Sequence, residues 1–185
     1  MTSPIRIQPP AGERLRRPLL AMALFWLLPA TGLATDETPA TDAREPRMFR
    51  DWKLECQKPE GADKEVCQIS QDIVFKENKR PLLHVAVGYA ANDNQPVAIF
   101  NLPLGISLPP GVTIKVDKGE QERLPIEHCF PGGCRAYLGL EEERLAAFKG
   151  GLEAQVTFHD LSRRPVAVPV SLRGFTAGFN ALGKD

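Results

Sequence analysis

The chain has 185 residues, of which 43% are apolar and 25% are charged. Its 23 basic and 23 acidic side chains cancel. This balance argues against a dedicated nucleic-acid-binding protein, because such proteins neutralise phosphates with a concentrated excess of Lys and Arg.

The N-terminal residues have the parts of a secretion signal. Residues 14–17 hold three arginines, and residues 19–28 form an almost unbroken apolar run. Gly32 and Ala34 fit the positions three and one before a cleavage site, so residues 1–34 are predicted to be a signal peptide that is removed. The alternative is an uncleaved membrane anchor. A spanning helix needs about 20 apolar residues, and this run has about half that number.

The mature chain is predicted to begin at Thr35 and to work in the periplasm, with outer-membrane association or secretion as alternatives. Cleavage of residues 1–34 removes four arginines and one glutamate, so 19 basic and 22 acidic side chains remain in the mature chain. Export as an unfolded chain is favoured, because its cysteines must pair after export. The pair Arg16-Arg17 keeps the twin-arginine route open.

Residues 35–48 are rich in Thr, Pro and acids and bury too little apolar surface to offset their ordering entropy, so they are predicted to form a flexible leader. Residues 49–185 suit a single domain, because a chain of about 150 residues buries roughly 70% of its unfolded surface.

Short apolar runs separated by turn residues predict strands through most of this domain. The clearest runs are residues 66–75, 82–90, 96–102 and 111–117. Within the last run Val112, Ile114 and Val116 alternate with polar residues, which is typical of an antiparallel strand with one buried face. The predicted fold class is all-β, mainly an antiparallel β-sandwich-like arrangement, with one or two short α-helices.

The C-terminal part predicts further strands and the helices. Val156 and Phe158 alternate with polar neighbours. In residues 166–172 every second residue is apolar and lies on one face, while Pro169 lies on the other face. Because proline cannot donate a ladder hydrogen bond, this pattern indicates an edge strand or a bulge. Residues 141–151 predict a helix, with three glutamates in its first turn and two glycines at its end. Residues 175–182 predict a shorter helix with three apolar residues on one stripe.

Four cysteines, Cys56, Cys67, Cys129 and Cys134, fall in the predicted mature domain. Disulfides are the default in an exported protein, and four cysteines allow three connectivities. Local pairing is favoured, because each pair brackets a short segment at the ends of predicted strands. Zinc binding and thiol exchange are the weaker alternatives: no C-x-x-C pair is present, and only Cys129 and Cys134, with His128 beside them, approach metal-ligand spacing. No metal site is predicted.

No catalytic residues are predicted. His84, His128 and His159 each have a structural explanation, the first as a cross-strand hydrogen-bond partner. Residues 105–109 resemble a nucleophile elbow, but proline occupies the last glycine position and a strand follows where a helix is required. The neighbouring His159, Asp160 and Ser162 do not form a triad by sequence adjacency alone. No phosphate-binding glycine loop or other cofactor motif is present.

Several short motifs occur in an order that resembles the invasion-associated locus B family of exported bacterial proteins. They are residues 52–56 (WKLEC), 67–71 (CQISQ), 103–105 (PLG), 111–112 (GV), 133–136 (GCRA) after Cys129, and 170–175 (VSLRGF). The resemblance implies a mostly β, periplasmic or envelope-associated protein, linked in some members to host-cell invasion. It supplies no catalytic residues.

The predicted function is a non-enzymatic binding or accessory role in the cell envelope, with no cofactor. The candidate binding loop comprises His128, Phe130, Pro131 and Arg135, because it places apolar residues in a ring closed by a disulfide. The partner is an unidentified envelope or host protein, peripheral membrane association is possible, and the oligomeric state is open. A host-directed adhesin and a hydrolase of envelope polymers are the alternatives.

Overall fold

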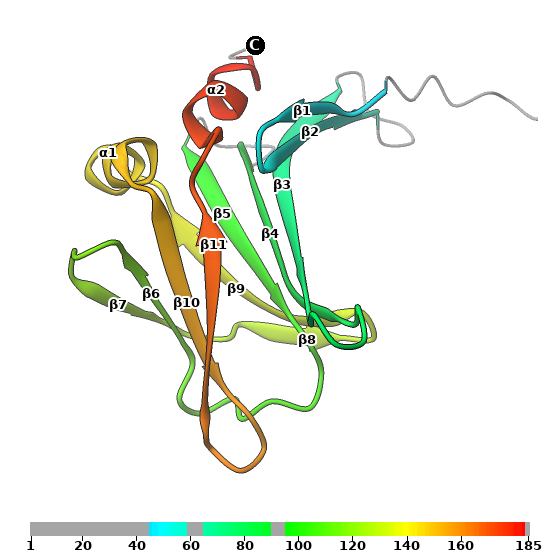
Figure 1. Ribbon diagram of the computed structural model, residues 1–185, viewed down its shortest axis with the longest axis vertical. Coiled ribbons are helices and arrows are strands. Elements are labelled where there is room, and N and C mark those ends of the chain that lie inside the picture. Colours follow the sequence, from blue (N-terminus) through cyan, green and yellow to red (C-terminus); the bar gives the residue numbers. More distant parts are fainter. Residues whose placement is uncertain (1–44, 59–64, 90–94, 184–185) are drawn as a thin grey trace, which may run out of the picture. The chain divides into compact units, whose positions relative to one another are not determined.

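Two antiparallel sheets form the body of the computed structural model (Figure 1). The structure describes residues 45–58, 65–89 and 95–183, which all belong to one compact unit, Ala40–Asp185. Within these residues the larger sheet has seven strands in the order β1 (Arg47–Phe49), β2 (Trp52–Gln57), β3 (Val66–Val74), β4 (Pro81–Tyr89), β5 (Pro96–Leu102), β9 (Gly133–Gly139), β8 (His128–Phe130). The smaller sheet has four strands in the order β11 (Pro165–Ser171), β10 (Glu153–His159), β6 (Val112–Val116), β7 (Gln121–Leu124). The helices are α1 (Glu142–Gly150) and α2 (Phe175–Asn180).

This architecture confirms the predicted antiparallel, sandwich-like fold with two short helices. The alternation predicted for residues 111–117 places Val112 and Ile114 in the core, while Thr113 and Lys115 are half-buried. Both sheets contribute fully buried side chains to the core, which include Trp52, Ile69, Val85, Val87 and Phe100 from the larger sheet and Val112, Val156 and Val168 from the smaller one.

The predicted edge strand is β11. Among the described strands it pairs only with β10, and Pro169 lies opposite Gln155 in that pairing. A proline cannot donate a ladder hydrogen bond, so its position at the edge costs the sheet nothing.

The two helices begin and end close to the predicted residues. Glu141 is the N-cap of α1, the next two glutamates lie in its first turn, and Lys149 lies in its last turn. Phe148 buries the helix against the core, where its ring centroid lies 5.4 Å from that of Phe175 in α2. Phe179 stacks on Phe175 at 5.8 Å, which confirms the apolar stripe predicted for the second helix.

A set of hydrogen bonds joins the end of β11 to β2 and β3; we call its four residues, Asp51, Trp52, Gln71 and Ser171, the inter-sheet latch. The Trp52 indole N–H donates to the Ser171 carbonyl at 2.9 Å. The Gln71 side chain donates to the carbonyls of Asp51 (3.0 Å) and Ser171 (3.2 Å) and accepts from the Ser171 amide (3.0 Å). The Ser171 hydroxyl donates to the Asp51 carboxylate at 2.6 Å. These bonds close one edge of the sandwich.

The predicted signal peptide, residues 1–34, and residues 35–44 of the predicted leader lie outside the described residues. The last two residues assigned to the leader, Arg47 and Met48, are part of β1, where they pair with β2. In the described part of the chain no helix is long and apolar enough to cross a membrane.

Candidate binding site

Both disulfides join residues that face each other on neighbouring strands. Cys56 in β2 is bonded to its cross-strand partner Cys67 in β3, and Cys129 in β8 is bonded to its partner Cys134 in β9. This is the local connectivity that the sequence favoured. In the chain-entropy model, loops of 11 and 5 residues stabilise the folded state by roughly 2 to 3 kcal/mol each.

The second disulfide fixes the β8–β9 hairpin, which carries the candidate binding loop. Two glycines of the turn make close contacts, and the second of these positions requires glycine. A Cβ on Gly132 would lie 2.7 Å from the Phe130 ring. A Cβ on Gly133, whose φ is 142°, would collide with the carbonyl oxygen of Leu102. The turn therefore holds the Phe130 ring close to the backbone.

The structure brings His128, Phe130 and Arg135 together, while Pro131 is exposed in the turn. The Arg135 guanidinium lies over the Phe130 ring, 4.4 Å from its centroid. The His128 ring is 6.2 Å from Phe130 and 5.9 Å from Tyr137. Tyr137, which was not predicted from the sequence, lies two residues after Arg135 on the same face of β9.

These side chains belong to the outer face of the larger sheet, defined as the face opposite the core. Strand pairing places five polar residues on it in one row across β3, β4, β5, β9 and β8: Asp72, His84, Asn101, Arg135 and His128. His84 Nδ1 lies 2.7 Å from the Asp72 carboxylate, so the predicted cross-strand role of His84 is confirmed.

Two atoms of this row are buried without a hydrogen-bond partner, Asn101 Oδ1 and Arg135 Nε. No described carboxylate lies within ion-pair distance of Arg135. Buried polar groups in native proteins normally have partners, so this row contains an unsatisfied acceptor and an unsatisfied donor at neighbouring positions, both beneath the surface of the outer face.

The next rows of the outer face form a largely apolar pocket of about 430 Å³. Its floor contains small residues, among them Ala86, Gly88 and Gly139, and Val97, Ile99 and Tyr137 stand beside them. This volume lies in the range of small-ligand sites, about 300 to 1,000 Å³, and such sites combine apolar walls with a few polar groups.

A pattern in the sequence indicates this pocket. Residues 82–90 and 96–102 are largely apolar on both faces, whereas the strands of a sheet with one solvent-exposed face alternate between apolar and polar residues. No described helix or strand covers the outer face (Figure 1). Its apolar positions are therefore not packed against any described helix or strand.

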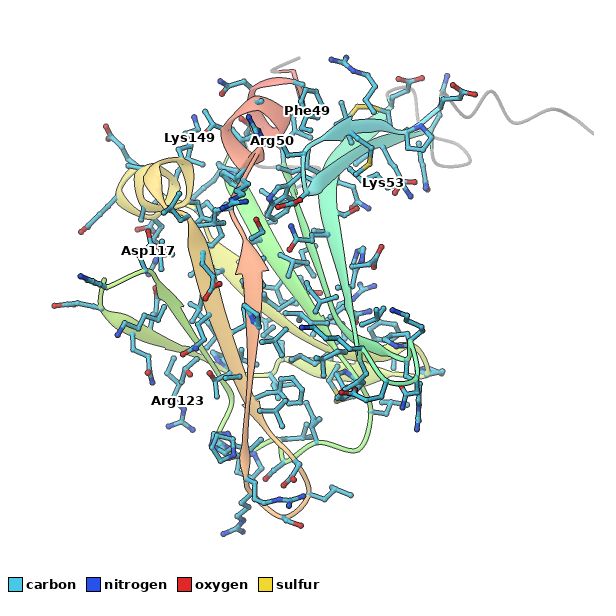
Figure 2. All side chains as sticks on the ribbon, viewed as in Figure 1. Phe49, Arg50, Lys53, Asp117, Arg123 and Lys149 are labelled. Atoms are coloured by element: carbon cyan, nitrogen blue, oxygen red, sulfur yellow. A yellow bond between two sulfur atoms is a disulfide. The ribbon has the colours of Figure 1, made fainter. Side chains whose placement is uncertain are left out.

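A second pocket, of about 670 Å³, lies between α1 and the β6–β7 hairpin. The Arg144 guanidinium is part of its lining and donates to both carboxylate oxygens of Glu122, at 2.7 and 2.9 Å. This hydrogen bond is the main reason that the pKa of Arg144 is raised. Figure 2 shows Asp117 at the same hairpin, where its carboxylate accepts from the amides of Leu152 and Glu153. Three charged groups of this pocket, Arg144, Glu122 and Asp117, are thus engaged with each other or with the backbone.

The serine and acidic groups near His159 do not form a catalytic arrangement. The Ser107 amide donates to the His159 carbonyl, and the segment containing Ser107 leads from β5 into β6 without a helix. The Asp160 carboxylate accepts from the Arg164 amide at 2.9 Å, which is the main reason that its pKa lies below its ordinary value. It also pairs with the Arg164 guanidinium at 2.7 Å. Asp160 is therefore engaged with Arg164 and does not orient His159.

Cys56, Glu65 and Cys67 are the one group of three potential metal ligands found among the described residues. Thiolates, not disulfide sulfurs, are the cysteine ligands of metals. Because the two cysteines are bonded to each other, this group does not offer a metal site in the oxidised protein.

Comparisons with known proteins agree with the fold and the motifs. Residues 52–183 match the family model described as Invasion associated locus B (IalB) protein. Two Invasion protein B homologs of Brucella abortus, from strains 2308 and 9-941, are each 27% identical over 135 residues, which cover 72% of this chain and 76% of theirs.

A solved structure has the same fold. The crystal structure of invasion associated protein b from Bartonella henselae matches with a TM-score of 0.65 and 23% identity, covering 74% of this chain and 93% of that one. The family match spans β2 to α2 and includes both disulfides, the hairpin and most of the latch. The chain therefore belongs to the invasion-associated locus B family.

Proposed function

We propose that the mature protein is a non-enzymatic binding protein of the cell envelope and that it captures its partner with the outer face around the β8–β9 hairpin. One observation carries the proposal. A disulfide and Gly133, whose conformation and close backbone contact favour glycine, fix the hairpin that places Phe130 and Arg135 beside an apolar pocket, and Asn101 Oδ1 and Arg135 Nε in the neighbouring row have no hydrogen-bond partner.

The environment of the protein supports this role. The two disulfides suit an oxidising compartment outside the cytoplasm, and the predicted signal peptide provides a route to the periplasm. A rigid hairpin reduces the ordering entropy that binding would otherwise cost. Aromatic residues and arginine are the side chains that most often dominate binding energy.

Substitution of Phe130 by serine tests the site. The variant loses the ring that supports Arg135, so we expect its affinity for a partner captured from envelope extracts to fall about tenfold or more. The half-buried ring lies at the edge of the sheet, so the melting temperature should change little. The measurement is affinity capture with the disulfides intact, followed by titration of the identified partner with purified protein.

The matched control is Phe75→Ser. Phe75 follows β3 and is 39% exposed, and it lies outside both the polar row and the pocket. Equal loss of capture in both variants would contradict the proposed site. A large fall in melting temperature for Phe130→Ser would assign the ring to the core.

A host-directed role is the second candidate, because the Brucella relatives are named invasion protein B homologs. It requires that the mature protein be exposed on the cell surface or secreted. Cell fractionation separates the two functions: recovery only from the soluble periplasmic fraction contradicts direct contact with a host.

A further inference from the structure

One end of the sandwich carries exposed leucines and arginines on loops that are bonded to each other. The loop of residues 103–111 joins β5 to β6, and the turn of residues 160–164 joins β10 to β11. The Ser107 amide donates to the His159 carbonyl at 2.9 Å, and Ile106 forms a β-bridge with Asp160. These two segments therefore form one surface, at the lower end of Figure 1.

Leu104, Leu108 and Leu161 project from this surface with exposed fractions of 55%, 46% and 76%. Ile106, between the first two, is buried and anchors its loop to the core. The exposure of the leucines thus belongs to an ordered surface. None of the three lines either pocket described above.

Three arginines flank these leucines. Arg123 at the end of β7 donates to the carbonyls of Pro109 (2.6 Å) and Pro110 (2.7 Å), which are neutral groups. Figure 2 shows Arg123 on the half of the molecule nearest these loops. Arg163 has no ion pair with any described residue, and Arg164 pairs with Asp160.

The loop patch is defined as Leu104, Leu108, Leu161, Arg123, Arg163 and Arg164. The turn of residues 160–164 holds two arginines and one aspartate, and the 103–111 loop has no charged residue. The predicted mature chain is weakly acidic, with 19 basic and 22 acidic side chains. The local excess of positive charge is therefore a property of this end and not of the whole chain.

We propose that the loop patch docks the protein on the surface of an anionic lipid bilayer. Protruding apolar side chains on separate loops can enter the boundary between lipid headgroups and acyl chains. Arginines around them are attracted by anionic headgroups. This inference is independent of the outer-face binding site.

Vesicle co-sedimentation tests the proposal on the purified, oxidised mature protein. We expect binding to phosphatidylcholine vesicles that contain about one-third phosphatidylglycerol, much weaker binding to pure phosphatidylcholine, and a loss of binding as salt is raised. No binding to the anionic vesicles, or equal binding to both kinds, would overturn the proposal.

Single substitutions locate the contact. Leu161→Ser should reduce partitioning about fivefold or more, because it removes apolar surface that enters the interface. Arg163→Asn should reduce it about fivefold at low salt, and asparagine tolerates the left-handed conformation of this residue, whose φ is 61°.

The chain offers matched controls at the other end of the sandwich. Leu152, which is 71% exposed, precedes β10 where Leu161 follows it, and Lys118 lies in the β6–β7 turn. Leu152→Ser and Lys118→Asn should bind vesicles as the unsubstituted protein does, and all four variants should keep their melting temperatures. If the controls lose as much binding, or if Leu161→Ser abolishes only the capture of a protein partner, the lipid contact is excluded.

Discussion

Gly174 connects β11 to α2 in a conformation that side chains rarely adopt, with a φ of 88°. A Cβ at this position would collide with the carbonyl oxygen of Phe49 in β1. The glycine therefore allows the chain to turn close to the first strand, and it places Phe175 edge-on against Trp52, with ring centroids 5.2 Å apart. Sequence motifs at residues 52–56 and 170–175 meet at this contact.

Replacement of Gly174 by alanine should lower the free energy of unfolding by more than about 2 kcal/mol, because backbone strain of about 1 to 2 kcal/mol adds to a steric clash. Gly183 is the control: its φ is 72°, but a Cβ added there would meet nothing within 4 Å beyond its chain neighbours. Gly183→Ala should cost only the backbone strain. Urea unfolding of the oxidised proteins measures both, and equal losses would contradict the clash.

Features of single turns and of strands adjacent in sequence were predictable, and contacts between distant strands were not. The glycines after Pro131 indicated a tight turn, and His84 was predicted to bond across the sheet. Tyr137 was missed, because residues 133–139 were not among the clearest predicted strands. Asn101 was missed, because its place beside Arg135 depends on the pairing of β9 with β5, which are far apart in sequence. Nothing in the local pattern fixes that pairing.

Among the elements, the edge strand β11 is held to the larger sheet by the inter-sheet latch. Gln71 satisfies both the amide and the carbonyl of Ser171. Loss of the Gln71 side chain should be destabilising, because it leaves a part-buried backbone group without a hydrogen-bond partner.

Substitution of Gln71 by leucine removes these bonds and keeps a side chain of similar size. We expect the free energy of unfolding to fall by about 1 to 3 kcal/mol. Gln155→Leu is the matched control, since Gln155 is an exposed residue of β10, and it should change stability by less than about 0.5 kcal/mol. A Gln71 variant as stable as the control would show that the latch contributes nothing.

Four strands were found from clear apolar runs, which are β3 to β6, whereas β9 and the shortest strands were not. β3, β4 and β5 each have seven or more residues, whereas β1 and β8 have three and β7 has four. Three or four residues are too few to establish an alternation. β8 contains His128, Cys129 and Phe130, and its place in the larger sheet depends on its hairpin with β9.

At the scale of the whole molecule, we assign contacts to two separate surfaces of the described residues. The outer face of the larger sheet combines apolar positions with a polar row, and we assign partner binding to it. The loop patch lies at the end of the sandwich, and we assign lipid contact to it. The family match establishes the fold and its relatives, while both assignments rest on the contacts of this chain.

Both assignments require that the polypeptide is exported, trimmed and oxidised into a domain stapled by two disulfides. Intact-mass spectrometry of the native protein, treated with a thiol-alkylating reagent without reductant, tests this requirement. We expect a chain that begins at Thr35 and carries no alkyl group. A chain that retains Met1 and is alkylated on Cys56, Cys67, Cys129 and Cys134 would contradict it.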